Sequence, residues 1–188
     1  PFATLGWPEN TPDLQCFYPT SVLVTDRGII NLWVARMVMM GLHFLKKEPF
    51  SDVIIHPTVQ DLEGRRFSKS RGVGFDPVEI IDEYGADALR FVLAAKCTGL
   101  QDIRIDKPPR DDSITVARNF ATKVWNTMRF ISLQGAAKYI SSARPDVKEI
   151  QDRWILGRAN DTVREVLSLL ERYEFGQAAW ALYHFVWD

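Results

Sequence analysis

Residues 21–56 are SVLVTDRGIINLWVARMVMMGLHFLKKEPFSDVIIH, and this stretch decides the fold. It begins with the β-rich run 21–25, continues through 29–47 with apolar residues on nearly every helical face, and ends in the strand candidate 50–56. The pattern predicts a buried strand, then a core helix covered on both sides, then a second strand. A strand, a helix and a strand in this order indicate a parallel βαβ unit.

The segments around this unit contain weaker patterns. Residues 1–19 hold four prolines and little periodicity, so we expect extended or irregular chain there. Residues 61–74 combine charges with three glycines, which predicts a mobile loop. A short β-rich run at 103–105 predicts one more strand.

The rest of the chain is predicted to be helical. Asp76 and Pro77 suit the cap and the first position of a helix, and Gly85 divides the next stretch into two short helices. The predicted helices cover residues 78–84, 86–96, 111–131, 145–170 and 175–187. Two prolines at 108 and 109 break both element types, so we divide the chain into 1–110 and 111–188. The predicted fold class is α/β: a parallel Rossmann-like half-domain followed by an all-α helical bundle segment.

Composition excludes several classes of protein. The chain has 188 residues, of which 46% are hydrophobic, and its formal net charge of −1 provides no global attraction for nucleic acid or membrane. Cys16 and Cys97 lie far apart and outside any CxxC spacing, which argues against a zinc site and a disulfide framework and favours a reducing, cytoplasmic location. The apolar run 32–45 is interrupted by Arg36 and His43 and is shorter than the roughly 20 residues that span a bilayer.

The strongest local motif comes after the βαβ unit. Residues 65–72 are RRFSKSRG, which places four cations and two hydroxyls in a loop that ends in glycine. Such a loop can wrap a polyphosphate, because open α/β sheets bind ligands at the carboxyl ends of their strands. Taken alone, the motif is equally consistent with a solvated basic turn.

Long strings of the chain resemble the class I aminoacyl-tRNA synthetases, and most closely those specific for valine. They are PFATLGWP (1–8), FYPTSVLVT (17–25), WVARM (33–37), DEYGADALRF (82–91) and RNFA (118–121). The resemblance covers nearly the whole chain. It implies the second half of a catalytic domain over 1–110, with its connecting segment, and the start of a helical anticodon-binding domain over 111–188.

The basic loop is similar to the family's Lys-Met-Ser-Lys-Ser signature, which clamps the ATP phosphates. The resemblance implies catalytic or nucleotide-binding roles for Arg66, Ser68, Lys69, Ser70 and Gly72, with Lys69 as the principal cation. Arg66 stands in place of a lysine, and Phe67 in place of a flexible methionine. These replacements predict altered loop closure.

Three further residues match family positions near the adenylate. At the positions that follow the first strand, the family sequence is similar to Gly-Tyr-Asp. This chain has Asp26, Arg27 and Gly28 there, so the glycine and the aspartate are exchanged. A carboxylate then stands where close backbone approach is wanted, and Gly28 offers no acceptor to a ribose hydroxyl, which predicts weaker adenylate binding. His56 matches a histidine near the adenine; a strand-end histidine bonded to backbone is the alternative.

Ile29 and Trp33 match positions that line the family's small apolar valine pocket. They are four residues apart, so they share a face if the segment is α-helical. Ordinary core packing is the alternative, because both residue types are usually buried. In the helical half, Trp125, Trp154 and Trp180 could stack on RNA bases, but we expect them in the core, with the surrounding cations on solvated faces.

The family reaction joins valine to ATP and then transfers the valyl group to tRNA(Val), with Mg²⁺ expected to accompany ATP and no metal bound by this segment. The family's His-Ile-Gly-His signature is absent, and Pro1 and Asp188 resemble internal positions, so we expect a fragment that is inactive without an N-terminal half. A non-catalytic RNA-binding or assembly module derived from this family is the main alternative. An unrelated nucleotide-binding α/β domain is a third.

Overall fold

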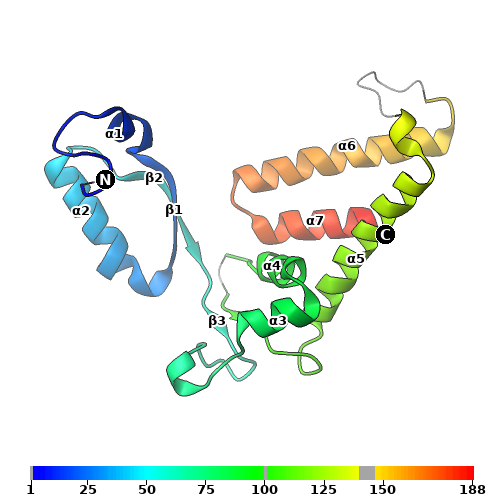
Figure 1. The fold of residues 1–188 in the computed structure, drawn as a ribbon, viewed down its shortest axis with the longest axis horizontal. Helices are drawn as coiled ribbons and strands as arrows, with labels where there is room; N and C mark the ends of the chain where they lie inside the picture. The colour runs from blue at the N-terminus through cyan, green and yellow to red at the C-terminus, as the bar shows by residue number, and fades with distance from the viewer. Residues whose placement is uncertain (1, 100, 140–146) are drawn as a thin grey trace. The chain divides into compact units, whose positions relative to one another are not determined.

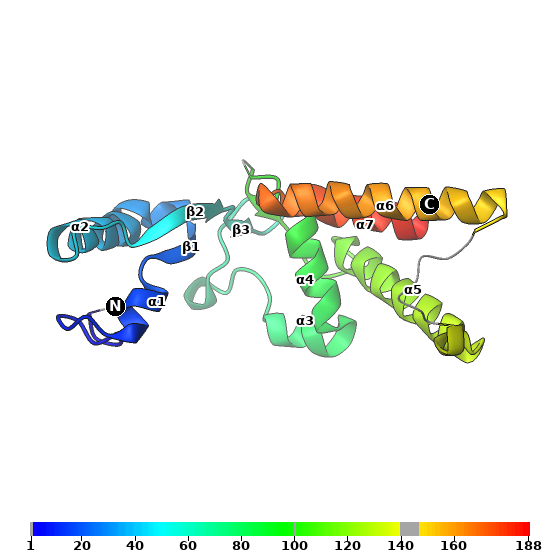
Figure 2. The same ribbon diagram turned by 90° about the horizontal axis from the view of Figure 1, so that it is seen from above.

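The computed structural model describes residues 2–99, 101–139 and 147–188. The chain divides into two compact units, Pro1–Thr58 and Val59–Asp188. Their helices and strands are labelled in Figure 1 and drawn from a second direction in Figure 2. Each unit has its own strands and helices.

The first unit is built on a parallel pair of strands. β1 (Thr20–Asp26) pairs with β2 (Phe50–His56), in a register that sets Thr20 opposite Phe50 and Asp26 opposite His56. The crossover contains α2 (Ala35–Phe44), which lies beside the strands in Figure 1. The predicted βαβ unit is therefore confirmed, and the carboxyl ends of both strands lie at one edge of the sheet.

The crossover differs from the single core helix predicted over 29–47. It begins with the 3₁₀ turn η1 (Arg27–Ile29), continues as the π-helical turn η2 (Ile30–Val34), and only then becomes α2. Leu32 is 62% exposed and Met39 69% exposed, so the prediction of a helix covered on both sides is wrong for this chain. The reason is area: within this unit a two-stranded sheet can cover only one face of a helix.

The prediction of irregular chain over 1–19 is also wrong in part. α1 (Pro12–Phe17) forms there, with Pro12 at its first turn. Thr11 caps the helix, because its hydroxyl accepts a hydrogen bond from the Leu14 backbone N–H at 3.1 Å. A threonine, a proline and an acidic residue in succession are an ordinary helix start, and four prolines in the segment obscured it. Pro1 lies outside the described residues.

The second unit begins with a minimal parallel sheet and two short helices. β3 (Val59–Gln60), which was not predicted, pairs with β4 (Ile103–Arg104). α3 (Pro77–Tyr84) and α4 (Ala86–Ala95) are separated at Gly85, whose φ of +90° favours glycine. The predicted split of the two helices is confirmed.

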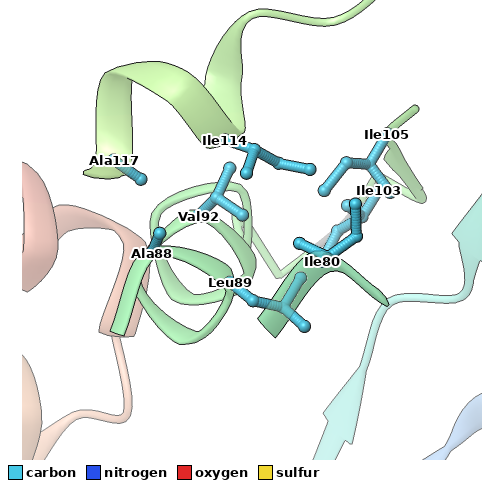
Figure 3. Close-up of a cluster of buried hydrophobic side chains, with 8 residues drawn as sticks. All are labelled: Ile80, Ala88, Leu89, Val92, Ile103, Ile105, Ile114 and Ala117. Atoms are coloured by element: carbon cyan, nitrogen blue, oxygen red, sulfur yellow. The ribbon is translucent and has the colours of Figure 1, made fainter. Parts of the chain in front are cut away.

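A compact hydrophobic core joins these elements to the first long helix. Figure 3 shows isoleucine side chains from β4, its following residue, α3 and α5 gathered around α4. Ile105 and Ile114 are 0% exposed and Ile80 is 1% exposed. Burying each such side chain contributes about 1.5–3 kcal/mol, so this cluster is the main anchor of the unit.

Three helices complete the unit: α5 (Ser113–Leu133), α6 (Ile150–Glu171) and α7 (Phe175–Trp187), with the short 3₁₀ turn η4 (Ala136–Tyr139) after α5. α7 packs against α6 and α4, and α4 against α5. A Cβ on Gly176 would lie 2.6 Å from the Cys97 carbonyl oxygen, so this crossing requires glycine. The predicted helical half is confirmed, although residues 145–146 of one predicted helix lie outside the described residues.

The expectation of buried tryptophans in this half is wrong. Trp125 is 71% exposed, Trp154 63% and Trp180 44%. Among the described residues, α5 packs mainly against α4, and α6 packs mainly against α7. Apolar residues on the other faces of α5 and α6 are therefore exposed. Helical periodicity identifies an apolar face but does not show which part of it another element covers.

Across the described ranges, the structure has no helix with the length and apolar composition needed to cross a membrane. In the same ranges, no three His, Cys, Asp or Glu side chains converge as a potential metal site. Cys16 is an exposed thiol and Cys97 a half-buried one, and neither forms a disulfide.

Candidate active site

The carboxyl ends of β1 and β2 bring together the first group of predicted site residues. The Asp26 side chain caps η1: one carboxylate oxygen accepts from the Gly28 N–H at 2.6 Å and the other from the Thr58 hydroxyl at 2.8 Å. Asp26 is only 8% exposed. Both oxygens therefore serve the fold, and the carboxylate holds the turn that starts the crossover.

His56 lies opposite Asp26 in the strand register. Its Nδ1 is 2.9 Å from the Pro57 carbonyl oxygen, and it donates to that oxygen when it carries the proton. The other ring nitrogen is left for a ligand. This geometry contains the backbone bond of the alternative interpretation, and the adenine contact of His56 stays a prediction.

The structure separates the two predicted valine-pocket residues. Trp33 lines an apolar cleft of about 540 Å³ between α2 and the segment before β1, together with Tyr18, Met37 and Phe50. Ile29 is 38% exposed and is not part of that lining. The four-residue spacing does not place them on one α-helical face, because Ile29 ends a 3₁₀ turn and Trp33 sits in a π-helical turn.

The basic loop in the second unit is a structured turn. Ser68 and Val73 form an antiparallel bridge in which Ser68 N–H donates to Val73 at 2.9 Å and Val73 N–H donates back at 3.1 Å. Between them, η3 (Lys69–Arg71) is closed by Gly72, whose φ of +63° lies in the left-handed region. The residues between the bridge partners are thus presented at the tip of a short hairpin.

Backbone hydrogen bonds close this turn, and the side chains at its tip are exposed. Lys69, Ser70 and Arg71 are exposed, and Arg66 is exposed at the base. The Ser68 and Ser70 hydroxyls are 3.2 Å apart, so they can act as a pair toward a common acceptor. Within the described parts of the chain, no carboxylate forms an ion pair with Lys69, so its exposed ammonium is available to a ligand.

A buried carboxylate holds the chain just before this turn. Asp61 is 5% exposed and accepts from the Arg65 backbone N–H at 2.8 Å and from the Arg65 Nε at 2.7 Å. Burial raises the pKa of the Asp61 carboxyl, but the Arg65 hydrogen bonds outweigh it and hold the pKa below its usual value. The Arg65 side chain is therefore bound to the fold just before the turn.

The predicted residues fall into two groups, one on each unit. Asp26, Gly28 and His56 gather at the strand ends, and the residues from Arg66 to Gly72 form the turn. Sequence reasoning missed Thr58 and Asp61. Two spacings could have indicated them. Thr58 follows His56, the strand-end residue opposite Asp26, by two residues, and Asp61 precedes Arg65 by four residues.

Comparison with known families identifies the class of this fold. Residues 1–106 match the family described as tRNA synthetases class I (I, L, M and V), and residues 152–188 match the anticodon-binding domain of tRNA ligase. The chain belongs to the class I tRNA synthetase family. The resemblance found in the sequence is confirmed, while the division at residue 110 and the role of each site residue remain predictions.

Within that class, the chain is similar to curated valine–tRNA ligases. The chain is 48% identical over 188 residues to the enzyme of Carboxydothermus hydrogenoformans and 49% identical over 188 residues to that of Thermotoga maritima. Each alignment covers all of this chain and 21% of the relative. The chain therefore spans about a fifth of the length of these relatives.

Solved structures support the fold. A LeuRS of Agrobacterium radiobacter in a ternary complex with tRNA and LeuAMS superposes with a TM-score of 0.73 and 26% identity, covering 89% of this chain and 22% of that one. A methionyl-tRNA synthetase of Mycobacterium tuberculosis bound by methionyl-adenylate gives 0.72 at 20% identity, covering 97% and 35%. The second likeness concerns the fold alone.

Proposed function

We propose that this chain is part of a valine–tRNA ligase, which activates valine with ATP and transfers it to tRNA(Val) in the cytoplasm. The observation that carries the proposal is the identity of 45–49% to valine–tRNA ligases along the whole chain. In this proposal residues 1–110 belong to the catalytic domain and residues 111–188 begin the helical anticodon-binding domain. A further N-terminal half of the enzyme completes the nucleotide site.

The turn from Arg66 to Gly72 is the proposed phosphate-binding element. Valine activation is an in-line attack by the amino-acid carboxylate on the α-phosphate of ATP, and pyrophosphate leaves. Charge grows on the departing phosphate oxygens, where an exposed ammonium at Lys69 and the paired hydroxyls of Ser68 and Ser70 can stabilise it. Mg²⁺ would be held mainly by the ATP phosphates, which suits an ion that keeps few protein ligands.

The direct test is ATP–pyrophosphate exchange by the complete ligase that contains this stretch. Exchange is expected with valine and more weakly with isoleucine, because one methylene changes binding in an apolar pocket by only about 1–3 kcal/mol. The 188-residue chain alone is expected to stay at background. Exchange that depends on another amino acid, or none from a folded complete enzyme, contradicts the proposal.

A second candidate function is favoured by the strand ends. Both oxygens of Asp26 are engaged by Gly28 and Thr58, and Gly28 has no side-chain acceptor for a ribose hydroxyl. A module that retained the fold, lost the adenylate site and still binds RNA or assembles with a partner would have these features. Calorimetric titration separates the two: such a module binds tRNA and not a non-hydrolysable valyl-adenylate analogue, whereas the ligase binds both.

A further inference from the structure

Phe67 occupies a place that the proposed chemistry does not use. It stands inside the basic motif, between Arg66 and Ser68, but its side chain is half-buried while its charged neighbours are exposed. Its ring lies 5.2 Å from the ring of Phe75 in an edge-on arrangement. Such aromatic pairs stabilise beyond the area they bury, so the two ends of the turn are joined by side chains as well as by backbone.

Gly74 is the third member of this contact. A Cβ at position 74 would lie 2.6 Å from two carbon atoms of the Phe67 ring, so the ring rests directly on the glycine backbone. The φ of Gly74 is +98°, a conformation that L side chains rarely adopt. Phe67, Gly74 and Phe75 therefore form one packed group, here called the aromatic latch.

The aromatic latch connects the turn to the core of the second unit. Phe67 and Phe75 both pack against the buried cluster that contains Ile80 and Ile105. The Phe67 backbone N–H also donates to the Val59 carbonyl at 3.2 Å. Immediately outside the latch comes the bridge between Ser68 and Val73, and beyond it the tip that carries Lys69.

We infer that Phe67 is a positioning residue: the aromatic latch holds the hairpin base so that the Lys69 ammonium is presented in a fixed place. This inference rests on the proposed function, in which Lys69 acts on the ATP phosphates. A methionine at this position would fill the space with rotatable bonds, whereas the rigid phenylalanine ring rests against the Gly74 backbone. Phe67 and Gly74 depend on each other, since the ring fits only over a residue without a Cβ.

The experiment compares variants of the complete ligase by valine-dependent pyrophosphate exchange. Phe67→Ala is expected to lower kcat about 10- to 100-fold with the KM for valine unchanged, because small misplacements of a catalytic group have effects of this size. Gly74→Ala should match or exceed that loss, and Phe67→Tyr should retain activity within about threefold because it keeps the ring. Phe91→Ala is the matched control: Phe91 packs against the same core but contacts Phe120 and Tyr183.

Hydrogen exchange gives a readout that a general loss of stability would not reproduce. In the 188-residue chain, Phe67→Ala should accelerate exchange at the Ser68 and Val73 amides selectively, and Phe91→Ala should not. Unchanged kcat in Phe67→Ala while Lys69→Ala is inactive overturns the inference and leaves the proposed function standing. If Lys69→Ala is itself fully active, the proposed function fails and the inference fails with it.

Discussion

The two groups of candidate site residues differ in whether side-chain or backbone atoms make the hydrogen bonds that hold them in place. At the strand ends the fold employs a side chain: the Asp26 carboxylate is 8% exposed and accepts from Gly28 and Thr58. In the turn it employs backbone: Ser68 and Val73 exchange N–H···O bonds, and the Lys69 side chain is exposed. Side-chain substitution should therefore act on stability at the strand ends and on ligand chemistry at the tip of the turn, beyond the aromatic latch.

The largest expected effect tests the turn. In the complete ligase, Lys69→Ala should reduce valine-dependent pyrophosphate exchange about 100- to 1000-fold, the usual cost of removing one transition-state charge contact. The stability of the 188-residue chain should change by less than about 0.5 kcal/mol, because the side chain is exposed. Arg71→Ala, an exposed cation in the same turn, is the control. An equal loss in that variant would mean that only total charge matters and would remove the special role of Lys69.

A smaller effect is expected at the strand ends. Asp26→Ala removes the cap of η1 and the acceptor for the Thr58 hydroxyl, which should cost about 1–2 kcal/mol of stability in the first unit. The local measurement is exchange of the Gly28 amide, which should become faster. Asp52→Ala, at an exposed position on β2, serves for comparison and should leave that amide unchanged. No difference between the two variants would contradict the capping role of Asp26.

The sequence predicts those features that follow from repeated spacing over many residues, and it misses those that depend on a single side-chain contact. Periodicity predicted the βαβ unit, the split at Gly85 and the long helices, because these follow from local propensity and repeated apolar spacing. It failed at the start of the crossover, where the Asp26 side chain caps the 3₁₀ turn η1 and the π-helical turn η2 follows, because neither feature has a repeated apolar spacing. Periodicity also failed to predict that Leu32 and Trp125 are exposed, because burial depends on which elements are present to cover a face.

The candidate site shows the same limit. Lys69 and its neighbours were found from the motif, because their chemistry lies in residue type and order. The inward bonds of Asp26 and the packing of Phe67 on Gly74 were not, because each depends on where the chain turns after a strand or bridge. A glycine seven residues after an aromatic residue has no local meaning until the hairpin brings the two together.

A third carboxylate, that of the half-buried Asp111, makes the stability of the fold depend on pH. Asp111 accepts from the Lys96 ammonium at 2.9 Å and from the Ser113 backbone N–H at 2.9 Å. Burial raises the pKa of the Asp111 carboxyl, and these two hydrogen bonds lower it by more, so the folded-state pKa lies below the usual value. The resulting stability is fully present above the unfolded-state pKa of about 3.9 and is lost as pH falls through the lower folded-state value.

The measurement is urea denaturation of the 188-residue chain against Asp111→Asn. At pH 7 the wild type should be more stable by about 1 kcal/mol, a modest figure because the Lys96 side chain is 29% exposed and solvent screens the pair. As pH falls from the unfolded-state pKa of about 3.9 through the lower folded-state pKa, the difference should shrink toward zero, since the wild-type carboxyl then becomes neutral like the asparagine amide. A difference that stays constant with pH would place the effect in the Ser113 backbone bond, which asparagine can preserve only in part, and would make Asp111 a cap like Asp26.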